Sequence, residues 1–259
     1  MFDETIPALT IEAPGRVAGE RAIWSGRDLI LGTFGAFGLF FIVLIAIVGP
    51  VAASYADKSP EVLVASAIAA GLWDLTVVAL VYLLVRKRGG SWRNLGFVPP
   101  RVGSFLPKST RWFGFGAMVL IGYVASIAFV DTYVVAVDLL GLDWLLPGDQ
   151  IPDESYSNTY VLVALAIAIV IMAPLAEEIF FRAFLFGGLR ARWRLVWAAL
   201  VSGFVFSLAH GDPGLVLPFT GVGVIFALLY ERSNSIYTSM AVHFVFNAVS
   251  FTLLVATNT

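Results

Sequence analysis

Residues 159–186 read TYVLVALAIAIVIMAPLAEEIFFRAFLF, a long apolar run that ends in two adjacent acids and an arginine. A helix of about 20 apolar residues crosses the hydrocarbon core of a bilayer, so this run is long enough to span it. At about 1.5 Å per residue it would be about 42 Å long, which exceeds a core of about 30 Å. The sequence therefore predicts a tilted, kinked or extended membrane helix. Pro174 is the expected kink, because proline removes a backbone hydrogen bond and frees a carbonyl about one turn earlier.

Similar apolar runs recur along the chain. Helices are expected at 29–51, 62–84, 112–139 and 159–186, and three shorter ones follow at 196–209, 215–230 and 236–255. The fifth and sixth are short enough for one of them to be partly re-entrant. Hydrophobic residues make up 59% of the chain and charged residues 13%, whereas soluble domains have about 25% charged residues. We therefore predict an all-α fold, a polytopic membrane helix bundle of about seven (six to eight) transmembrane helices in one domain, 1–259.

Basic residues alternate between the predicted loops. They gather before the first helix, in the loop 86–111, in residues 190–194 and at Arg232, whereas the intervening loops hold Lys58 and otherwise acids. Positively charged loops stay in the cytoplasm. We therefore predict a cytoplasmic N-terminal segment, 1–28, an outside C-terminus, and an integral protein of the plasma membrane. The basic loop either rests on the anionic inner leaflet through its arginines and Trp92 or only stops transfer during insertion.

Charge and cysteine content exclude several functions. The formal net charge of −2 gives no basic face of the kind that nucleic-acid binding requires. The chain has no cysteine, which excludes disulfides, thiolate catalysis and cysteine-ligated zinc. The expected partners are the lipid bilayer and a membrane protein or peptide substrate.

The ionisable residues inside the predicted spans are concentrated in the last four helices. Such residues are costly in a bilayer unless they are paired or face a wet cavity, so each is a functional candidate. Together with one phenylalanine and one asparagine, they form three pairs spaced four residues apart, which places each pair on one helix face. Glu178 and Arg182 can form an ion pair, and Glu177, one position earlier, is rotated by roughly 100° from Glu178. The other two pairs are Phe206 with His210 and His243 with Asn247.

These motifs resemble those of the CAAX-protease and bacteriocin-processing family of intramembrane proteases, also called the Abi family. That family has Glu-Glu-x-x-x-Arg, Phe-x-x-x-His and His-x-x-x-Asn motifs, and this chain has all three in the same order. The resemblance covers roughly residues 161–254, and the expected catalytic helices are 159–255. It implies an intramembrane endopeptidase in which Glu177 activates water as general base. His210, His243 and Asn247 would orient the water or bind the oxyanion, while Glu178 and Arg182 support the site as an ion pair.

Peptide hydrolysis needs a base for water and donors aimed at the carbonyl oxygen, and these residues supply both. Zinc or another divalent ion is the alternative, with Glu177, His210 and His243 as ligands. That set would leave no second carboxylate well placed as base, so we favour a site without a cofactor.

Two other functions stay open at this stage. One is a non-catalytic membrane module that binds a peptide or confers self-immunity. The other is a proton-coupled transporter that uses the two acids with Asp74, although the missing internal repeat counts against it. Asp74 lies in the middle of the second predicted helix and matches no family motif. It is expected to pair with Arg182 or to form a hydrogen bond with a helix.

Overall fold

The computed structural model describes residues 21–101, 111–148 and 151–258, and every regular element in this part of the chain is a helix. The predicted segment 1–28 lies outside the described residues as far as residue 20. The elements are α2 (Gly26–Ala52), α3 (Pro60–Lys87), α4 (Arg111–Leu139), η2 (Asp143–Leu145), η3 (Asp153–Ser155), α5 (Thr159–Ala166), η4 (Ile167–Met172), α6 (Ala173–Glu177), η5 (Glu178–Phe186), α7 (Gly187–Arg190), α8 (Leu195–Leu208), η6 (Pro213–Leu215), α9 (Val216–Ser233) and α10 (Ile236–Asn258).

The predicted membrane bundle of about seven helices is confirmed. Within the described residues, six helices are long and apolar enough to cross a membrane, and α8 is a shorter apolar helix. The elements α5, η4, α6, η5 and α7 follow one another without a break as Thr159–Arg190, which we call the central helix. It is 32 residues long, slightly longer than the 28-residue run that the sequence indicates.

Side-chain caps fix where the first two long helices begin. Ser25 caps α2 by accepting a hydrogen bond from the N–H of Asp28, whose carboxylate accepts from the Ser25 N–H in return. Ser59 caps α3 by accepting a hydrogen bond from the N–H of Val62, with Pro60 at the first helical position. These caps satisfy backbone groups that the first turn of a helix leaves free.

The core surrounds the central helix. All nine residues of η5 are buried, including four phenylalanines. Trp24 stacks on Phe184 and donates its indole N–H to the Phe184 carbonyl at 3.1 Å. On the opposite side, Ser202 of α8 donates to the Phe181 carbonyl at 2.8 Å. The segment that begins with Glu178 and holds Arg182 is therefore fully enclosed.

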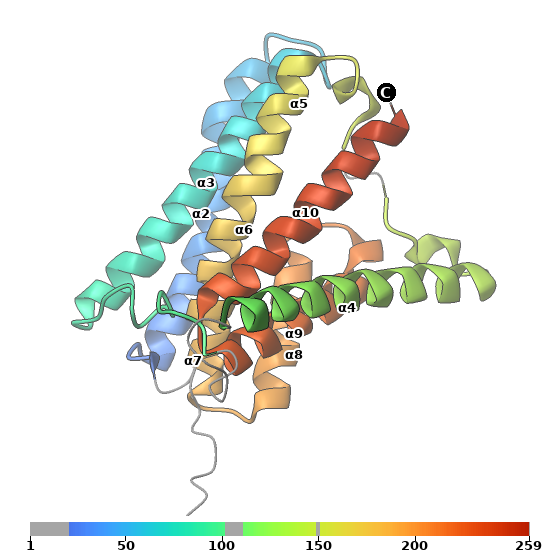
Figure 1. Cartoon of the computed structure of the whole chain (residues 1–259). Coiled ribbons are helices and arrows are strands. Elements are labelled where there is room, and N and C mark those ends of the chain that lie inside the picture. Colours follow the sequence, from blue (N-terminus) through green and yellow to red (C-terminus); the bar gives the residue numbers. More distant parts are fainter. Residues whose placement is uncertain (1–20, 102–110, 149–150, 259) are drawn as a thin grey trace, which may run out of the picture.

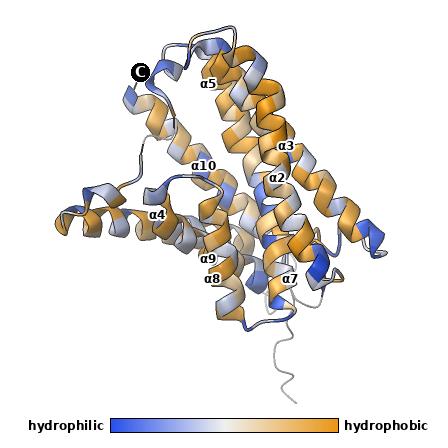
Figure 2. Cartoon of the chain, turned by 180° about the vertical axis from the view of Figure 1, so that it is seen from behind, coloured by the Kyte–Doolittle hydropathy of each residue, from blue (hydrophilic) through white to orange (hydrophobic). Residues whose placement is uncertain are grey.

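The outer helices are mostly apolar, as the hydropathy colours of α2, α3 and α8 in Figure 2 show, and many of their large apolar side chains are exposed. Phe34 is 75% exposed and Ile45 70% exposed, and only 11% of the apolar window of α2 is buried inside the protein. In α9 the buried share is 44%. A surface of this kind is stable against lipid and not against water, so α2 lies at the periphery and α9 in the interior.

The helix α4 crosses the bundle. Figures 1 and 2 show α4 running transversely to α2, α3 and the central helix, across α9 and α10. Glycines permit the close approach: a Cβ at Gly221 of α9 would lie 2.0 Å from the ring of Phe129, and one at Gly122 of α4 would lie 2.6 Å from Leu229. Hydropathy predicted the existence of this helix, and it gives no information on crossing angle.

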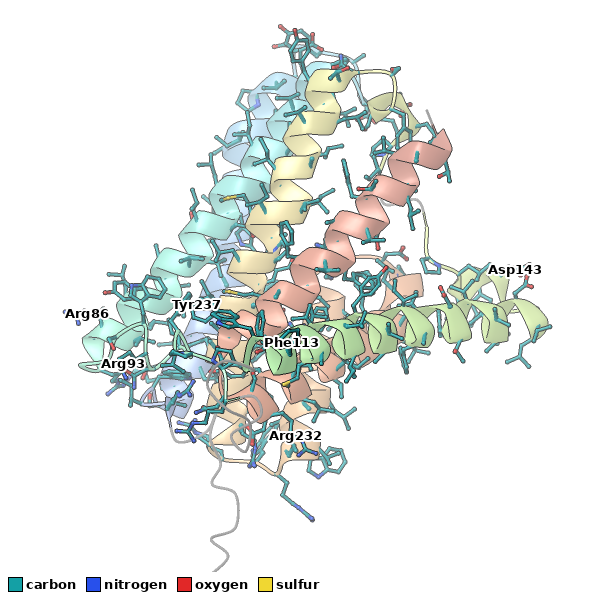
Figure 3. All side chains as sticks on the ribbon, in the orientation of Figure 1. Arg86, Arg93, Phe113, Asp143, Arg232 and Tyr237 are labelled. Atoms are coloured by element: carbon teal, nitrogen blue, oxygen red, sulfur yellow. The ribbon has the colours of Figure 1, made fainter. Side chains whose placement is uncertain are left out.

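The basic loops share one end of the bundle, and the acidic loops lie elsewhere. Ile236 N–H donates to the Gly96 carbonyl at 3.0 Å, which joins the loop after α3 to the loop after α9. Lys58 pairs with Glu154 at 3.7 Å, which joins the loop after α2 to that before the central helix. Figure 3 shows Arg93 and Arg232 toward the end opposite the C-terminus. The predicted alternation is thus present, and the assignment of the basic end to the cytoplasm stays a prediction.

Candidate active site

The central helix departs from α-helical geometry on both sides of α6. The stretches η4 and η5 are π-helical, so that N–H groups bond five residues back, as Ala173 does to the Ala168 carbonyl. Pro174 has no N–H, and in this register it leaves the Ile169 carbonyl without a backbone donor. The side chain of Asn247 in α10 supplies that donor, with its Nδ2 at 2.8 Å from the Ile169 oxygen. The proline break thereby joins α10 to the central helix.

Glu178 and Arg182 form the predicted ion pair. The Arg182 Nε lies 3.4 Å from Glu178 Oε2, and both side chains are fully buried. The guanidinium carbon also lies 4.3 Å from the centre of the Phe206 ring and 5.1 Å from that of Phe226. Aromatic faces stabilise a desolvated cation, so the two rings compensate in part for the water that this arginine lacks.

Glu178 has a second partner that the sequence did not indicate. Its Oε1 lies 3.0 Å from Nδ1 of His243 in α10. A carboxylate only accepts hydrogen bonds, so Nδ1 carries the proton and Nε2 points away from Glu178. Glu178 therefore fixes the orientation of His243 while Arg182 balances its charge.

Glu177 faces the other nitrogen of the same imidazole. Its Oε2 lies 3.7 Å from His243 Nε2, and this oxygen is buried and has no hydrogen-bond partner. The side chain as a whole is 15% exposed, against 4% for His243. The two adjacent glutamates thus lie on opposite sides of one histidine, as the predicted rotation of roughly 100° between them allows.

His210 follows the C-terminal end of α8. Its Nδ1 lies 3.0 Å from the Phe206 carbonyl oxygen, so Nδ1 is the donor and Nε2 of the neutral ring is an acceptor. The ring packs edge-on against Phe206 and Phe219, with ring centres 4.9 and 4.6 Å apart. The aromatic walls fix the plane of the imidazole.

A single cavity joins three of the predicted residues. Glu177, His210 and Asn247 line a space of about 360 Å³ between the central helix, the residues after α8, and α10. Aromatic side chains make up much of the remaining wall: Phe219, Phe246 and Phe251. A mostly apolar cavity with a few convergent polar groups is typical of ligand sites.

The predicted partners of Asp74 are wrong. Arg182 pairs with Glu178, and the hydrogen bonds and ion pairs of the described residues include none from the Asp74 carboxylate, which is 4% exposed. Asp74 belongs to α3, which packs against α6, the element that ends at Glu177. Sequence spacing within one helix could not reveal this contact between two helices.

The described residues contain no group of three histidine, aspartate or glutamate side chains that could hold a metal ion. The alternative ligand set of Glu177, His210 and His243 therefore does not fit the present geometry. Metal dependence stays a prediction, and no step below is derived through a metal.

Comparison with known proteins gives a family for this region. Residues 159–249 match the family model described as type II CAAX prenyl endopeptidase Rce1-like. This match agrees with the resemblance to the CAAX-protease and bacteriocin-processing family that the three motifs indicate. The segment contains all six predicted site residues, Glu177, Glu178, Arg182, His210, His243 and Asn247.

A curated relative points to the same family. The chain is 35% identical over 77 residues to the Bacillus subtilis (strain 168) protein named "Putative membrane peptidase YdiL", and the match covers 30% of this chain and 32% of that protein. The chain thus matches about a third of that relative's length. No solved structure matches the chain. The resemblance stated from three short motifs is confirmed at the level of the family, whereas the roles of individual residues stay predictions.

Proposed function

We propose that this protein is an intramembrane endopeptidase that hydrolyses a peptide bond of a membrane-associated protein or peptide. The observation that supports this most is the position of Glu177, whose buried and unbonded carboxylate oxygen lies at the cavity and beside His243. A general base needs a free lone pair within reach of its proton donor. Glu177 has one, whereas the two oxygens of Glu178 face Arg182 and His243.

The proposed reaction starts with a water in the cavity. Glu177 takes one proton from this water, and the resulting hydroxide adds to the carbonyl carbon of the scissile bond. The carbonyl oxygen then bears the negative charge. When the carbon–nitrogen bond breaks, the proton on Glu177 passes to the leaving amine, so that the carboxylate is restored.

The remaining residues position the reacting groups. His210 Nε2 can accept a hydrogen bond from the water and hold it toward Glu177. The Nε2–H of a protonated His243, supported by Glu178 at its other nitrogen, can donate to the oxyanion. Asn247 uses one amide N–H for Ile169, which leaves its Oδ1 and second N–H for the cavity. If His243 is protonated, the two glutamates, Arg182 and His243 sum to zero charge, which suits a buried cluster.

Replacement of Glu177 by glutamine tests the proposal. The change keeps the shape and removes the base, so we expect cleavage to be lost while folding and membrane insertion are retained. Glu61→Gln at the exposed start of α3 is the matched control, because it makes the same change outside the cavity. Comparative proteomics of membranes that contain each variant should show a substrate that accumulates uncleaved with Glu177→Gln alone. Near-native turnover by Glu177→Gln would refute the mechanism.

The proteomic comparison and a flux assay distinguish the protease from the other two functions. A non-catalytic binding or self-immunity module would give the same peptide pattern in native and Glu177→Gln membranes. A transporter would show pH-dependent flux in liposomes without cleavage. The family match and the free carboxylate at a peptide-sized cavity favour the protease.

A further inference from the structure

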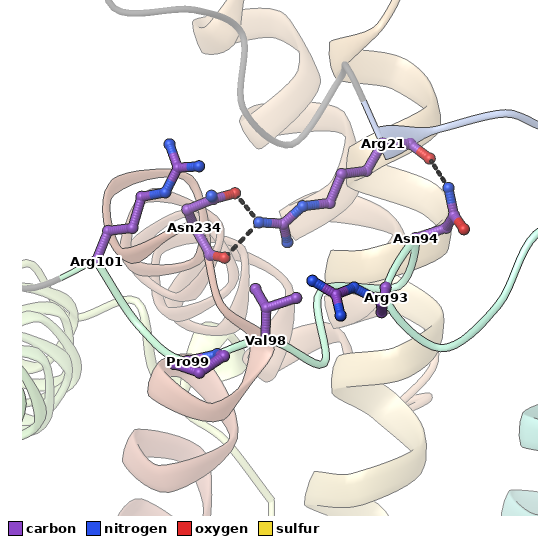
Figure 4. A pocket seen from close by; sticks show the side chains of 7 residues that line it. All are labelled: Arg21, Arg93, Asn94, Val98, Pro99, Arg101 and Asn234. Atoms are coloured by element: carbon purple, nitrogen blue, oxygen red, sulfur yellow. Dashed lines mark hydrogen bonds between the residues drawn. The ribbon is translucent and has the colours of Figure 1, made fainter.

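A second cavity, of about 430 Å³, lies at the basic end of the bundle and shares no lining residue with the cavity at Glu177. Three segments form it: Arg21 in the stretch that precedes α2, the loop after α3, and the junction of α9 and α10. Figure 4 shows three arginines around it, Arg21, Arg93 and Arg101, with Asn94 and Asn234 between them. Among the residues that the structure describes, the lining contains no acidic side chain.

Backbone hydrogen bonds hold the walls of this cavity in place. Arg101 N–H donates to the Ser233 carbonyl at 2.6 Å, and Ile236 N–H donates to the Gly96 carbonyl at 3.0 Å. Ser235 Oγ adds a bond to the Val98 carbonyl at 2.6 Å. The loop after α3 is therefore attached to the α9–α10 junction at several points.

Arg21 completes the frame from the N-terminal side. Its Nη2 donates to both the carbonyl and the side-chain oxygen of Asn234. Its own carbonyl accepts from Asn94 Nδ2 at 3.2 Å. Asn234 has a left-handed backbone, with φ at 55°, and ends α9. Arg21 thus holds the α9–α10 junction through Asn234, and it also adds a positive charge to the lining of the cavity.

The other two guanidinium groups, those of Arg93 and Arg101, make no hydrogen bond or ion pair with the described residues. Arg93 and Arg101 are exposed, and the hydrogen bonds and ion pairs of the described residues include none from their side chains. Elsewhere at this end, by contrast, Arg190 pairs with Glu231 at 2.9 Å and Arg88 with Asp28 at 2.8 Å. These two guanidinium groups lie beside that of Arg21. Each guanidinium can donate two parallel N–H hydrogen bonds, so the three together suit an anion with several acceptor oxygens.

Aromatic residues indicate the depth of this cavity in the bilayer. Trp92 stacks on Tyr82 with ring centres 4.3 Å apart, and it meets Phe97 edge-on. Phe97 in turn contacts Tyr237 at the start of α10. Arg93 follows Trp92 directly in the chain. Tryptophan and tyrosine prefer the headgroup region, so the arginines next to this group lie at the level of lipid phosphates.

From these observations we infer that the cavity of Arg21, Arg93 and Arg101 binds a phosphate group, and that its occupant is the headgroup of an anionic phospholipid. The apolar outer faces of the helices would carry the acyl chains, while the arginines bind the phosphate. This site is independent of the proposed protease activity, because none of its residues lines the Glu177 cavity.

The test uses the purified full chain in a neutral detergent. Dihexanoyl phosphatidylglycerol is titrated onto it, and bound lipid is counted by native mass spectrometry. Dihexanoyl phosphatidylcholine serves as the headgroup comparison and inorganic phosphate as the free-ion comparison. We expect phosphatidylglycerol to be retained in preference to both. The double variant Arg93→Gln, Arg101→Gln should bind it roughly tenfold or more weakly, since two cationic contacts are lost.

The matched control is the double variant Arg194→Gln, Arg232→Gln. It removes the same charge from exposed arginines outside this cavity, and it should bind as the native chain does. Equal loss in both double variants would overturn the site in favour of diffuse attraction. Retention of inorganic phosphate without retention of the lipid would overturn the assignment to a headgroup. If the pocket variant melts lower than the control, Arg93→Lys, Arg101→Lys replaces it, and it must retain more lipid than the glutamine pair for the inference to stand.

Discussion

Replacement of Arg182 by alanine would leave the Glu178 carboxylate in the core without its cation. The pair is fully buried, with Nε and Oε2 3.4 Å apart, and removal of one partner of such a pair typically costs about 3–5 kcal/mol. His243 would still donate to Glu178, which reduces the cost. The loss of the contacts between the guanidinium and the rings of Phe206 and Phe226 increases it. We therefore expect about 3–4 kcal/mol, a reduction in melting temperature on the order of 10 °C.

The measurement is thermal unfolding in a fixed detergent, followed by the fluorescence of the seven tryptophans. A second variant removes both charges at similar volume, Glu178→Gln with Arg182→Met. Loss of both members of a buried pair is far cheaper than loss of one, so the double variant should melt higher than Arg182→Ala. Native melting of Arg182→Ala would refute the pairing. A double variant that melts lower than the single would show that the arginine acts by packing and not by charge.

Three further predictions concern the fold and the site. Single cysteines introduced at Arg93 and Arg192 should label from the cytoplasmic side and one at Thr257 from outside, which impermeant reagents on intact cells and on permeabilised cells would distinguish. Asn247→Ala should lower the stability of the fold by about 1 kcal/mol, because the Ile169 carbonyl loses its donor. In a Pro174→Ala background the loss measured by thermal unfolding should be smaller, since a backbone N–H is restored, and an equal loss in both backgrounds would refute the link between these residues. Purified enzyme should keep most of its activity after exhaustive chelation, and loss restored by one equivalent of zinc per chain would establish a metalloprotease.

The sequence predicted the helices well because bilayer thickness imposes a strong constraint. An apolar helix must be long enough to span the core and must satisfy its own backbone hydrogen bonds, so each span can be read from a single stretch of residues. The predicted span 236–255 corresponds to Ile236–Asn258, and 112–139 to Arg111–Leu139. The transverse course of α4 could not be predicted, because it depends on contacts such as Phe129 against Gly221, between residues far apart in the sequence.

The site shows the same difference between contacts within one helix, which the sequence predicts, and contacts between helices, which it does not. The Glu178–Arg182 pair could be predicted because both residues lie on one helix, one turn apart. The contact of Glu178 with His243 depends on the packing of α10 against the central helix. The π-helical register could not be predicted from the sequence either. Pro174 indicated only that a backbone carbonyl would be freed, and nothing in the sequence indicated that the amide of Asn247 would donate to that carbonyl.

These hidden contacts explain why two adjacent glutamates can have different environments in one small space. In a regular α-helix Glu178 and Arg182 would still pair, but nothing would relate Glu177 to α10. The donor from Asn247 to Ile169 and the bond from His243 to Glu178 are four residues apart on α10, so one face of α10 is attached to the central helix on both sides of α6. Glu177 lies between these two attachments, with its free carboxylate oxygen beside His243. The proline, the asparagine and the ion pair therefore all contribute to the same result: an unbonded oxygen of Glu177 lies beside His243, and Glu177 lines the cavity.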